Sequence, residues 1–335
     1  MKKISKGIIE LNNQPSIISY GAIAGKKESE GPLGGEIDET GTDSLFGQDT
    51  FEKAESHLQK RALEIALKKG NLSNTDIDIV FAGDLLNQCI GSSFGIRDFN
   101  IPFTGLYGAC STMALSLAFA AITVECGMAE KAAAITSSHF CSAERQYRFP
   151  LEYGGQRTPT AQWTVTGSGA VIVSNAQDKP YISKIAIGKI NDLGIKDANN
   201  MGAAMAPAAY DTIKRFFNAT NTSPKDYDMI FTGDLGYVGS ELLYKLFEKD
   251  NIELRNFHKD CGLMIFDRDK QDVHCGGSGC GCSATVLCSH ILNELNSGKL
   301  RNILFCATGA LLSPTSTMQG ESIPCIAHLV QICKN

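Results

Sequence analysis

An internal repeat is the feature that most constrains the fold of this 335-residue chain. The segment Asp226–Leu235 (DYDMIFTGDL) repeats the segment Asp76–Leu85 (DIDIVFAGDL) at an offset of 150 residues. In the first copy, Ile79–Ala82 has the apolar composition of a buried strand, and Gly83 lies at its carboxyl end. Two copies separated by this large offset predict two similar halves related by a pseudo-twofold axis. They do not predict a solenoid, because solenoids are built from shorter and more numerous units.

The segments around the repeat occur in the same order in both copies. Apolar periodicity predicts a helix at Phe51–Lys69, with Thr50 as its N-cap, and a matching helix at Ala203–Phe217. Short apolar runs predict buried strands at Ala132–Thr136 and Ile303–Ala307. Each copy therefore contains the pattern of a strand–helix–strand unit.

We predict an α/β protein of two duplicated βαβ-type halves, residues 1–175 and 176–335, with buried helices between the sheets. In folds of this kind, ligands bind where strand ends and helix starts converge. The candidate site residues should therefore come from both halves.

The stretch Gly105–Phe140 holds the first candidate site. Cys110 is followed by Ser111, Thr112 and an apolar run at Met113–Val124, which is hydrophobic all round and so predicts a buried helix. A cysteine at a helix start meets unpaired backbone N–H groups, which can lower the pKa of its thiol or bind a carboxylate. The alternative is a structural cysteine, since free cysteine is often simply buried.

Composition excludes several classes of function. A net charge of −5 without any block of Lys or Arg gives no support to nucleic-acid binding. The 12 cysteines lie mostly in apolar runs and follow no signal peptide, so we expect free thiols in a reducing compartment. No stretch reaches the length of a membrane span. The spacing of Cys275, Cys280 and Cys282 differs from that of zinc knuckles, so no metal or cofactor is predicted.

The segment after Phe140 interleaves cations with aromatic residues. Arg145, Arg148 and Arg157 lie close to Tyr147 and to the only tryptophan, Trp163. An arginine can chelate a carboxylate while an aromatic ring stacks on the ligand, so the segment suits an aromatic dianion. A solvated loop with arginine–glutamate pairs is the equally supported alternative.

Six motifs make the chain resemble the thiolase-like superfamily and, within it, the stage V sporulation protein AD family. They are GDLLNQ (Gly83–Gln88), GACSTM (Gly108–Met113), TSSH (Thr136–His139), EYGGQRTPTAQWTVTG (Glu152–Gly167), DCGLMIFD (Asp260–Asp267) and GGSGCGCSA (Gly276–Ala284). The resemblance covers nearly the whole chain and implies a thiolase-like fold.

The resemblance also implies a function without catalysis. A member of this family would bind dipicolinic acid (pyridine-2,6-dicarboxylate) for its uptake into the developing spore, with release at germination and co-bound calcium as further options. It would lie peripherally at the forespore inner membrane, with integral membrane proteins of the same operon as partners. Homodimers are frequent in the superfamily, so a homodimer is also expected by analogy.

The alternative is a ketoacyl synthase III-like condensing enzyme with Cys110 as its nucleophile. Such enzymes need a histidine and an asparagine to stabilise the oxyanion, and each such donor supplies about 2.7–4 kcal/mol. The position of the histidine is occupied by Gly233, and the region of the asparagine, Ser278–Gly281, contains neither residue type. The sequence therefore favours a binding protein.

The predicted ligand-binding residues follow from their positions in that fold. One carboxylate would meet the N–H groups at Cys110–Thr112, and the end of the neighbouring strand would form the wall. The glycine-rich turn of the second half would close the cavity, and one arginine would supply compensating charge. The candidates are Cys110, Ser111, Thr112, Ser137, Ser138, His139, Arg145, Arg148, Arg157, His274, Gly277 and Cys282.

Overall fold

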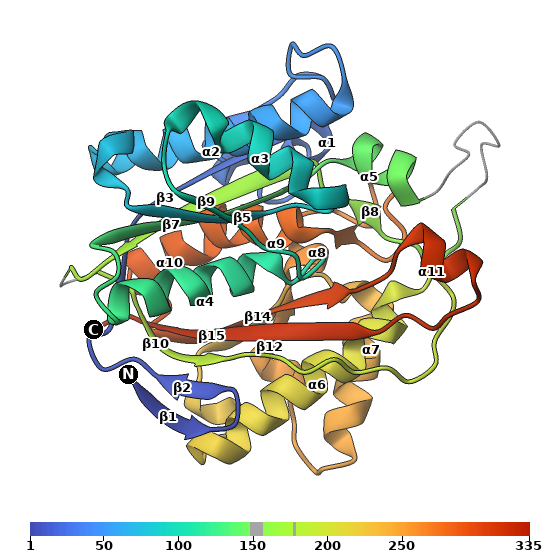
Figure 1. Cartoon of the computed structure of the whole chain (residues 1–335). Coiled ribbons are helices and arrows are strands. Elements are labelled where there is room, and N and C mark those ends of the chain that lie inside the picture. The colour runs from blue at the N-terminus through green and yellow to red at the C-terminus, as the bar shows by residue number, and fades with distance from the viewer. Residues whose placement is uncertain (148–156, 177–178) are drawn as a thin grey trace.

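The structure, a computed structural model, describes residues 1–147, 157–176 and 179–335. It has five layers, in which helices cover both outer faces of two sets of strands and further helices lie between them (Figure 1). The α/β architecture with buried helices between strands, predicted from the sequence, is confirmed.

The first set of elements builds the upper part of the molecule in Figure 1. It consists of β3 (Ser16–Ala24), α2 (Phe51–Gly70), β5 (Ile79–Gly83), α3 (Ile90–Ile96), β6 (Phe103–Gly105), α4 (Thr112–Glu125), β7 (Lys131–Ser138) and β9 (Gly167–Ser174). Its strands lie in the order β3-β9-β7-β5-β6. Strands β5, β6 and β7 are parallel, whereas β9 is antiparallel to both β7 and β3.

The second set repeats this arrangement. It consists of β10 (Tyr181–Ala186), α6 (Met201–Thr220), β11 (Met229–Thr232), α7 (Gly236–Glu248), β12 (His258–Asp260), α9 (Cys280–Val286), β14 (Asn302–Ala310) and β15 (Cys325–Cys333). The order β10-β15-β14-β11-β12 matches the first set strand for strand, with the same parallel and antiparallel pairs. The repeat seen in the sequence is therefore a repeat of topology.

Shorter elements complete the described chain. They are β1 (Lys2–Ser5), β2 (Ile8–Glu10), α1 (Lys26–Ser29), β4 (Glu39–Thr40), α5 (Phe140–Tyr147), β8 (Trp163–Thr164), α8 (Cys261–Met264), β13 (Gly277–Ser278), a π-helical turn (Leu287–Ile291), α10 (Leu292–Asn296) and α11 (Pro314–Met318), with short 3-10 turns between them. The hairpin β1–β2 is not part of the first set, because β2 pairs with β10.

Local sequence explains the ends of the outer helices. Thr50 caps α2 by accepting a hydrogen bond from the N–H of Lys53, as the sequence predicted, and the helix ends in left-handed Asn71. The matching helix α6 also ends in a left-handed asparagine, Asn221. The two helices therefore share the same type of C-terminal cap.

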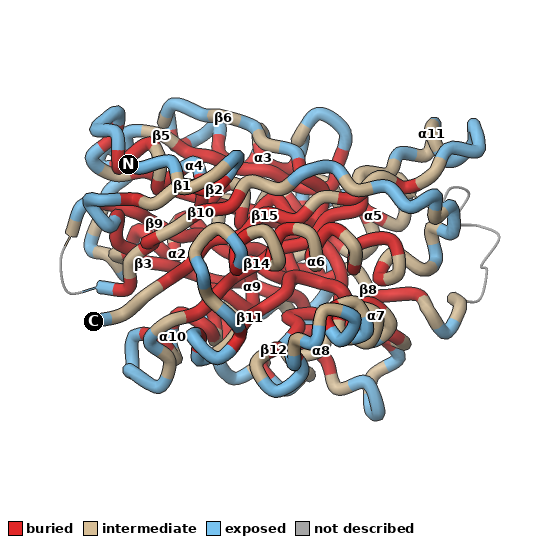
Figure 2. Tube along the Cα trace, turned by 90° about the horizontal axis from the view of Figure 1, so that it is seen from below, coloured by how far each residue is buried: buried red, intermediate tan, exposed pale blue. Residues whose placement is uncertain are grey.

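Helix α4 lies in the central layer and packs against strands of both sets. Most of its apolar residues are buried, among them Met113, Leu117 and Val124, whereas Phe119 is 38% exposed. The same core includes Val171 from the first set and Phe305 from the second. Figure 2 shows buried chain through the middle of the molecule and exposed chain mainly in the peripheral loops. The two sets of strands therefore share one core.

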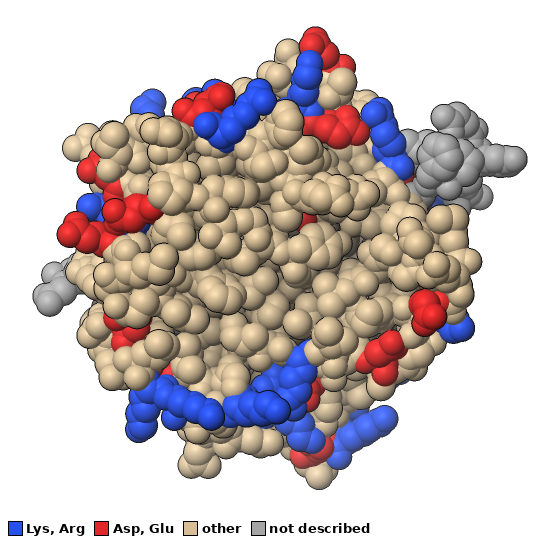
Figure 3. Space-filling model, in the orientation of Figure 1, with Lys and Arg blue, Asp and Glu red and all other residues tan. Residues whose placement is uncertain are grey.

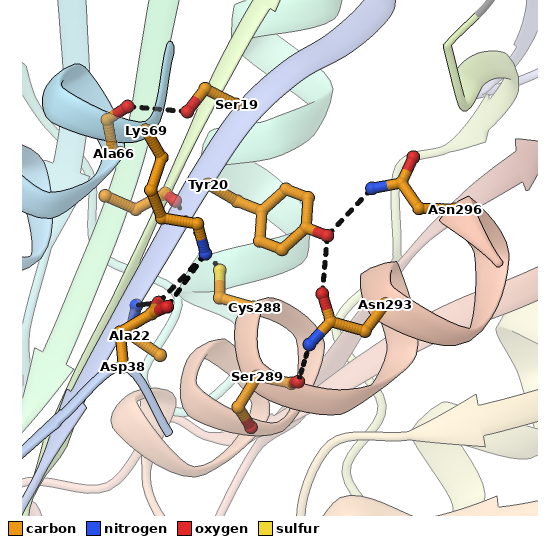
Figure 4. A network of polar contacts seen from close by, with 11 residues as sticks. Ser19, Tyr20, Ala22, Asp38, Ala66, Lys69, Cys288, Ser289, Asn293 and Asn296 are labelled. Carbon is orange, nitrogen blue, oxygen red and sulfur yellow. Dashed lines mark hydrogen bonds and ion pairs between the residues drawn. The ribbon is translucent and has the colours of Figure 1, made fainter. Parts of the chain in front are cut away.

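A polar network also joins the two sets (Figure 4). The Tyr20 hydroxyl on β3 donates to Asn293 Oδ1 at 2.6 Å and accepts from Asn296 Nδ2 at 2.7 Å, both on α10. The Lys69 ammonium lies 4.6 Å from the centre of the Tyr20 ring and pairs with Asp38 at 2.9 Å. A buried tyrosine thus links β3 and α2 to α10, which lies in the second half of the chain.

None of the helices in the described ranges combines the length and the apolar character that crossing a bilayer requires.

Replacement of Leu117 by alanine tests the shared core. Leu117 is fully buried in α4, so we expect a loss of about 2–5 kcal/mol in the free energy of unfolding. Guanidinium-induced unfolding measures this change. Met128→Ala, at a residue with 71% exposure, is the control and should change stability by no more than about 0.5 kcal/mol. Equal, small effects of both changes would show that α4 is not a core helix.

Candidate functional site

The candidate site is a cavity at the start of α4. Its volume is about 210 Å³, which suits a ligand smaller than a typical drug molecule. Residues from both sets of elements form its walls, as predicted from the duplication. The lining consists of Leu85, Ala109, Cys110, Ala143, Glu144, Tyr147, Gln162, Thr164, Ala198, Asn199, Met201, Ser278, Ala310 and Leu312.

A tight turn places Cys110 in this cavity. Ala109 has a left-handed φ of 50°, and the carbonyl of Gly108 lies against Gly309 of β14, where a Cβ atom would come within 2.2 Å of its oxygen. A side chain at position 309 would therefore displace the turn, so glycine is required there. The strand of one half thus fixes the position of the thiol in the other half.

The backbone N–H groups at the start of α4 are mostly occupied. The N–H of Ser111 donates to the carbonyl of Gly108, and the N–H of Thr112 donates to that of Ala109. The hydroxyls of Ser111 and Thr112 donate to the same two carbonyls, each at 2.6 Å. These two residues build the turn, and neither lines the cavity.

Ser278 and Asp234 lie next to the thiol. Cys110 Sγ is 3.9 Å from Ser278 Oγ, and the Ser278 hydroxyl donates to Asp234 Oδ2 at 2.9 Å. Asp234 also accepts from the Gly279 N–H and the Thr308 hydroxyl, each at 2.8 Å. The carboxylate follows β11, next to Gly233, where condensing enzymes would place their histidine. Ser278 lies in the segment where they would place their asparagine.

This environment makes the thiol a poor nucleophile. Burial, together with the negative charge of Asp234, raises the pKa of Cys110 well above that of a free thiol. The sequence-based interpretation that the helix start could lower this pKa is therefore wrong for the structure. Desolvation and a nearby carboxylate outweigh the helix dipole here.

Ser137, Ser138 and His139 do not line this cavity. Ser137 donates to the buried Glu55 carboxyl, and Ser138 donates to the carbonyl of Val165. His139 Nε2 lies 2.6 Å from the carbonyl oxygen of Ser44, and its Nδ1 accepts from the N–H of Cys141. Burial lowers the pKa of His139. These three side chains are committed to protein partners.

The predicted arginines also have protein partners where the structure describes them. Arg145 pairs with Glu52 at 3.2 Å, and Arg157 pairs with Asp272 at 3.1 Å. The Arg157 guanidinium also lies 4.6 Å from the centre of the Trp163 ring. Arg148 lies outside the described residues.

The second-half candidates His274, Gly277 and Cys282 do not line the cavity. His274 contacts Asp272 at 2.9 Å, the carbonyl of Gly277 accepts from Gln162, and the Cys282 thiol faces the carbonyl of Gly233. Within the described residues, no group of three His, Cys, Asp or Glu side chains is placed to hold a metal ion.

Sequence reasoning missed several cavity residues. Asp234 could have been found, because it is the repeat partner of Asp84 at the end of the duplicated strand. Gln162 lies in one of the family motifs and donates to the carbonyls of Asp234 and Gly277, but its position gave no sign of this contact. Asn199 comes from an irregular segment without any motif.

Comparison with solved structures identifies the fold as that of thiolase-like condensing enzymes. The 3-oxoacyl-[acyl-carrier-protein] synthase III of Aquifex aeolicus matches with a TM-score of 0.56 and 14% identity, over 95% of this chain and 99% of that chain. A variant of OleA from Xanthomonas campestris matches with a TM-score of 0.65 and 14% identity, over 97% and 98%. At these identities the likeness concerns the fold alone.

The chain belongs to the stage V sporulation protein AD family. The model of that family matches residues 5–333. Stage V sporulation protein AD of Bacillus subtilis (strain 168) is 48% identical over 310 residues, which is 92% of this chain and 91% of that protein. The family resemblance predicted from the motifs is confirmed.

Replacement of Asp234 by asparagine tests the electrostatics of the site. Loss of the negative charge should lower the pKa of Cys110 and speed its alkylation by iodoacetamide at pH 8 severalfold. In the parent protein, Cys110 should react more slowly than the exposed Cys126. Mass spectrometry of the two peptides measures both rates, and Cys126 is the internal control. An unchanged rate at Cys110 would mean that Asp234 does not control the thiol.

Proposed function

We propose that this protein binds dipicolinic acid in the cavity at Cys110 without chemical turnover, and that binding serves uptake of the acid into the developing spore and its release at germination. Membership of a sporulation family supports the biological role. The proposal that no catalysis takes place rests on one observation. Cys110 contacts Ser278, whose hydroxyl donates a hydrogen bond to Asp234. No histidine is found among the described residues that line the cavity, and burial beside Asp234 keeps the thiol protonated. Cys110 therefore lacks the imidazole base and the reactive thiolate of a condensing enzyme.

The lining suits a small aromatic acid. Leu85, Met201 and Leu312 offer apolar surface to a ring, and Thr164 and Asn199 offer polar groups to carboxylates. The cavity is built mainly of apolar groups with a few polar ones, as is usual for small-molecule sites.

The charge of the ligand needs compensation. No Lys or Arg occurs among the described residues that line the cavity, and Glu144 is one of them. A desolvated dianion without a counter-charge would be strongly disfavoured. In this proposal, calcium enters with the dipicolinate and neutralises it, and the protein recognises the resulting neutral chelate.

Calorimetric titration with dipicolinic acid tests the binding. We expect Cys110→Ala to weaken binding about tenfold, because one wall of the cavity is removed. Cys126→Ala, at an exposed thiol, is the matched control and should bind like the parent. Calcium should tighten the binding, and isophthalate, which lacks the ring nitrogen, should bind more weakly. Unchanged affinity in Cys110→Ala would place the ligand elsewhere.

The alternative function is acyl transfer by Cys110, which the fold of the structural neighbours favours. The same preparations, incubated with acyl-CoAs and examined by mass spectrometry, separate the two functions. We expect no acyl adduct on Cys110. An adduct that forms and turns over would favour the enzyme and contradict the binding proposal.

The proposal also concerns the location of the protein in the cell and its partner proteins. It places the protein peripherally at the forespore inner membrane, together with integral membrane proteins of the same operon. Family membership is the support for this placement. Absence of the protein from inner-membrane fractions of sporulating cells would contradict it.

A homodimer is the proposed assembly. The outer edge of β6 pairs with no other described strand, and Phe103 on it and Phe94 on α3 are 39% and 49% exposed. The face that includes α3 and α4 carries few charged side chains across its middle (Figure 3). An uncharged face with exposed aromatic residues beside a free strand edge suits a second copy of the chain.

Sedimentation equilibrium tests the dimer. We expect twice the mass of the 36.0 kDa chain for the parent protein, and dissociation in Phe103→Glu, which puts a charge on the strand edge. Met128→Glu is the control, because Met128 is 71% exposed in the turn after α4. A monomeric parent protein at micromolar concentration would contradict the proposal.

A further inference from the structure

A second cavity lies next to the one at Cys110. The inner cavity, with Cys110, has a volume of about 210 Å³, and the outer cavity has a volume of about 300 Å³. Tyr147 and Leu312 line both cavities. Tyr147 ends α5, whereas Leu312 follows β14, so two side chains from distant parts of the sequence form the wall between the cavities.

Hydrogen bonds hold Tyr147 in this wall. Its hydroxyl donates to the carbonyl of Leu85 at 2.6 Å and lies 3.2 Å from the Tyr107 hydroxyl. The preceding residue, Gln146, donates to the same carbonyl and accepts from the N–H of Asn87, each at 2.9 Å. Burial raises the pKa of Tyr147, so the hydroxyl remains protonated and keeps its donor role. The ring is fixed at its end and through its neighbour.

The outer cavity has a distinct chemistry. Apolar and aromatic side chains dominate its lining, and no Asp, Glu, Lys or Arg is found there among the described residues. Its lining includes Gln88 and Cys89, with left-handed φ values of 56° and 53°. The lining suits an uncharged, mostly apolar group. The apolar and aromatic members are Leu86, Tyr107, Tyr147, Leu311, Leu312 and Pro314.

We propose that Tyr147 is a specificity-determining residue: its ring closes the inner cavity and limits the length of the ligand that binds at Cys110. Without the ring, the two cavities join, and a ligand with an apolar extension reaches from Cys110 into the outer cavity. The identity of the short ligand rests on the function proposed above. The partition itself rests only on the two cavities and their shared wall.

Calorimetry with a short and a long ligand tests the partition. The short ligand is dipicolinic acid, and the long one is its 4-phenyl derivative. The parent protein and Tyr147→Phe, which keeps the ring, should bind the long acid at least about tenfold more weakly than the short one. Tyr147→Ala should bind the long acid about tenfold more tightly than the parent does. Leu312→Ala removes the other half of the wall and should shift the preference in the same direction.

A second readout does not depend on dipicolinate. The uncharged dye Nile red, which fluoresces in apolar surroundings, should gain emission with Tyr147→Ala and with Leu312→Ala, but not with Tyr147→Phe. Circular dichroism shows whether each variant is folded. If the dye responds but no variant binds dipicolinate, the partition stands and the proposed function fails. If Tyr147→Ala and Leu312→Ala are folded but show neither increased Nile red emission nor tighter binding of the long acid, Tyr147 does not separate the cavities.

Discussion

The buried carboxylate of Asp234 is the interaction on which the site depends. A charge removed from water is costly unless hydrogen bonds replace its hydration. Three donors do so here, namely the hydroxyls of Ser278 and Thr308 and the N–H of Gly279. They tie the end of β11 to β13 and β14, and so fix one wall of the cavity. Burial, with the negative charge of Asp234 as the second cause, raises the pKa of the Cys110 thiol, so Asp234 contributes to both the shape and the chemistry of the site.

The first half has an equivalent carboxylate in a different environment. Asp84 accepts from the N–H and the hydroxyl of Ser92, and the buried Glu55 lies near it. Burial and the nearby Asp84 carboxyl raise the pKa of Glu55 above that of a free glutamate. Ser137 and Ser142 donate to Glu55. The duplicated position thus forms a polar network with Ser92 in one half and holds the cavity residue Ser278 in the other.

The sequence predicted the fold well. The periodicity of apolar residues can be recognised within a short segment, and the duplication can be recognised by comparing the sequence with itself. The helix at Phe51–Gly70 and the buried helix after Cys110 were expected nearly to the residue. The site was predicted less well, because hydrogen-bond partners depend on contacts between distant segments. Ser111 and Ser138 have suitable hydroxyls, yet nearby carbonyls use them. The direction of the Cys110 pKa shift also required the position of Asp234, which lies in the other half of the chain.

The hairpin β1–β2 has a consequence for how the protein is made. Its strand β2 pairs with β10, through Ile8 opposite Ala186 and Glu10 opposite Lys184. On the ribosome, the first ten residues are therefore synthesised long before the strand that receives them. Strand β2 can pair with β1 at once, but it lacks its partner β10 until about 180 more residues have followed, since contacts so distant in sequence form late. The hairpin is thus completed by a strand of the second half, although it precedes the whole first set of elements in the sequence.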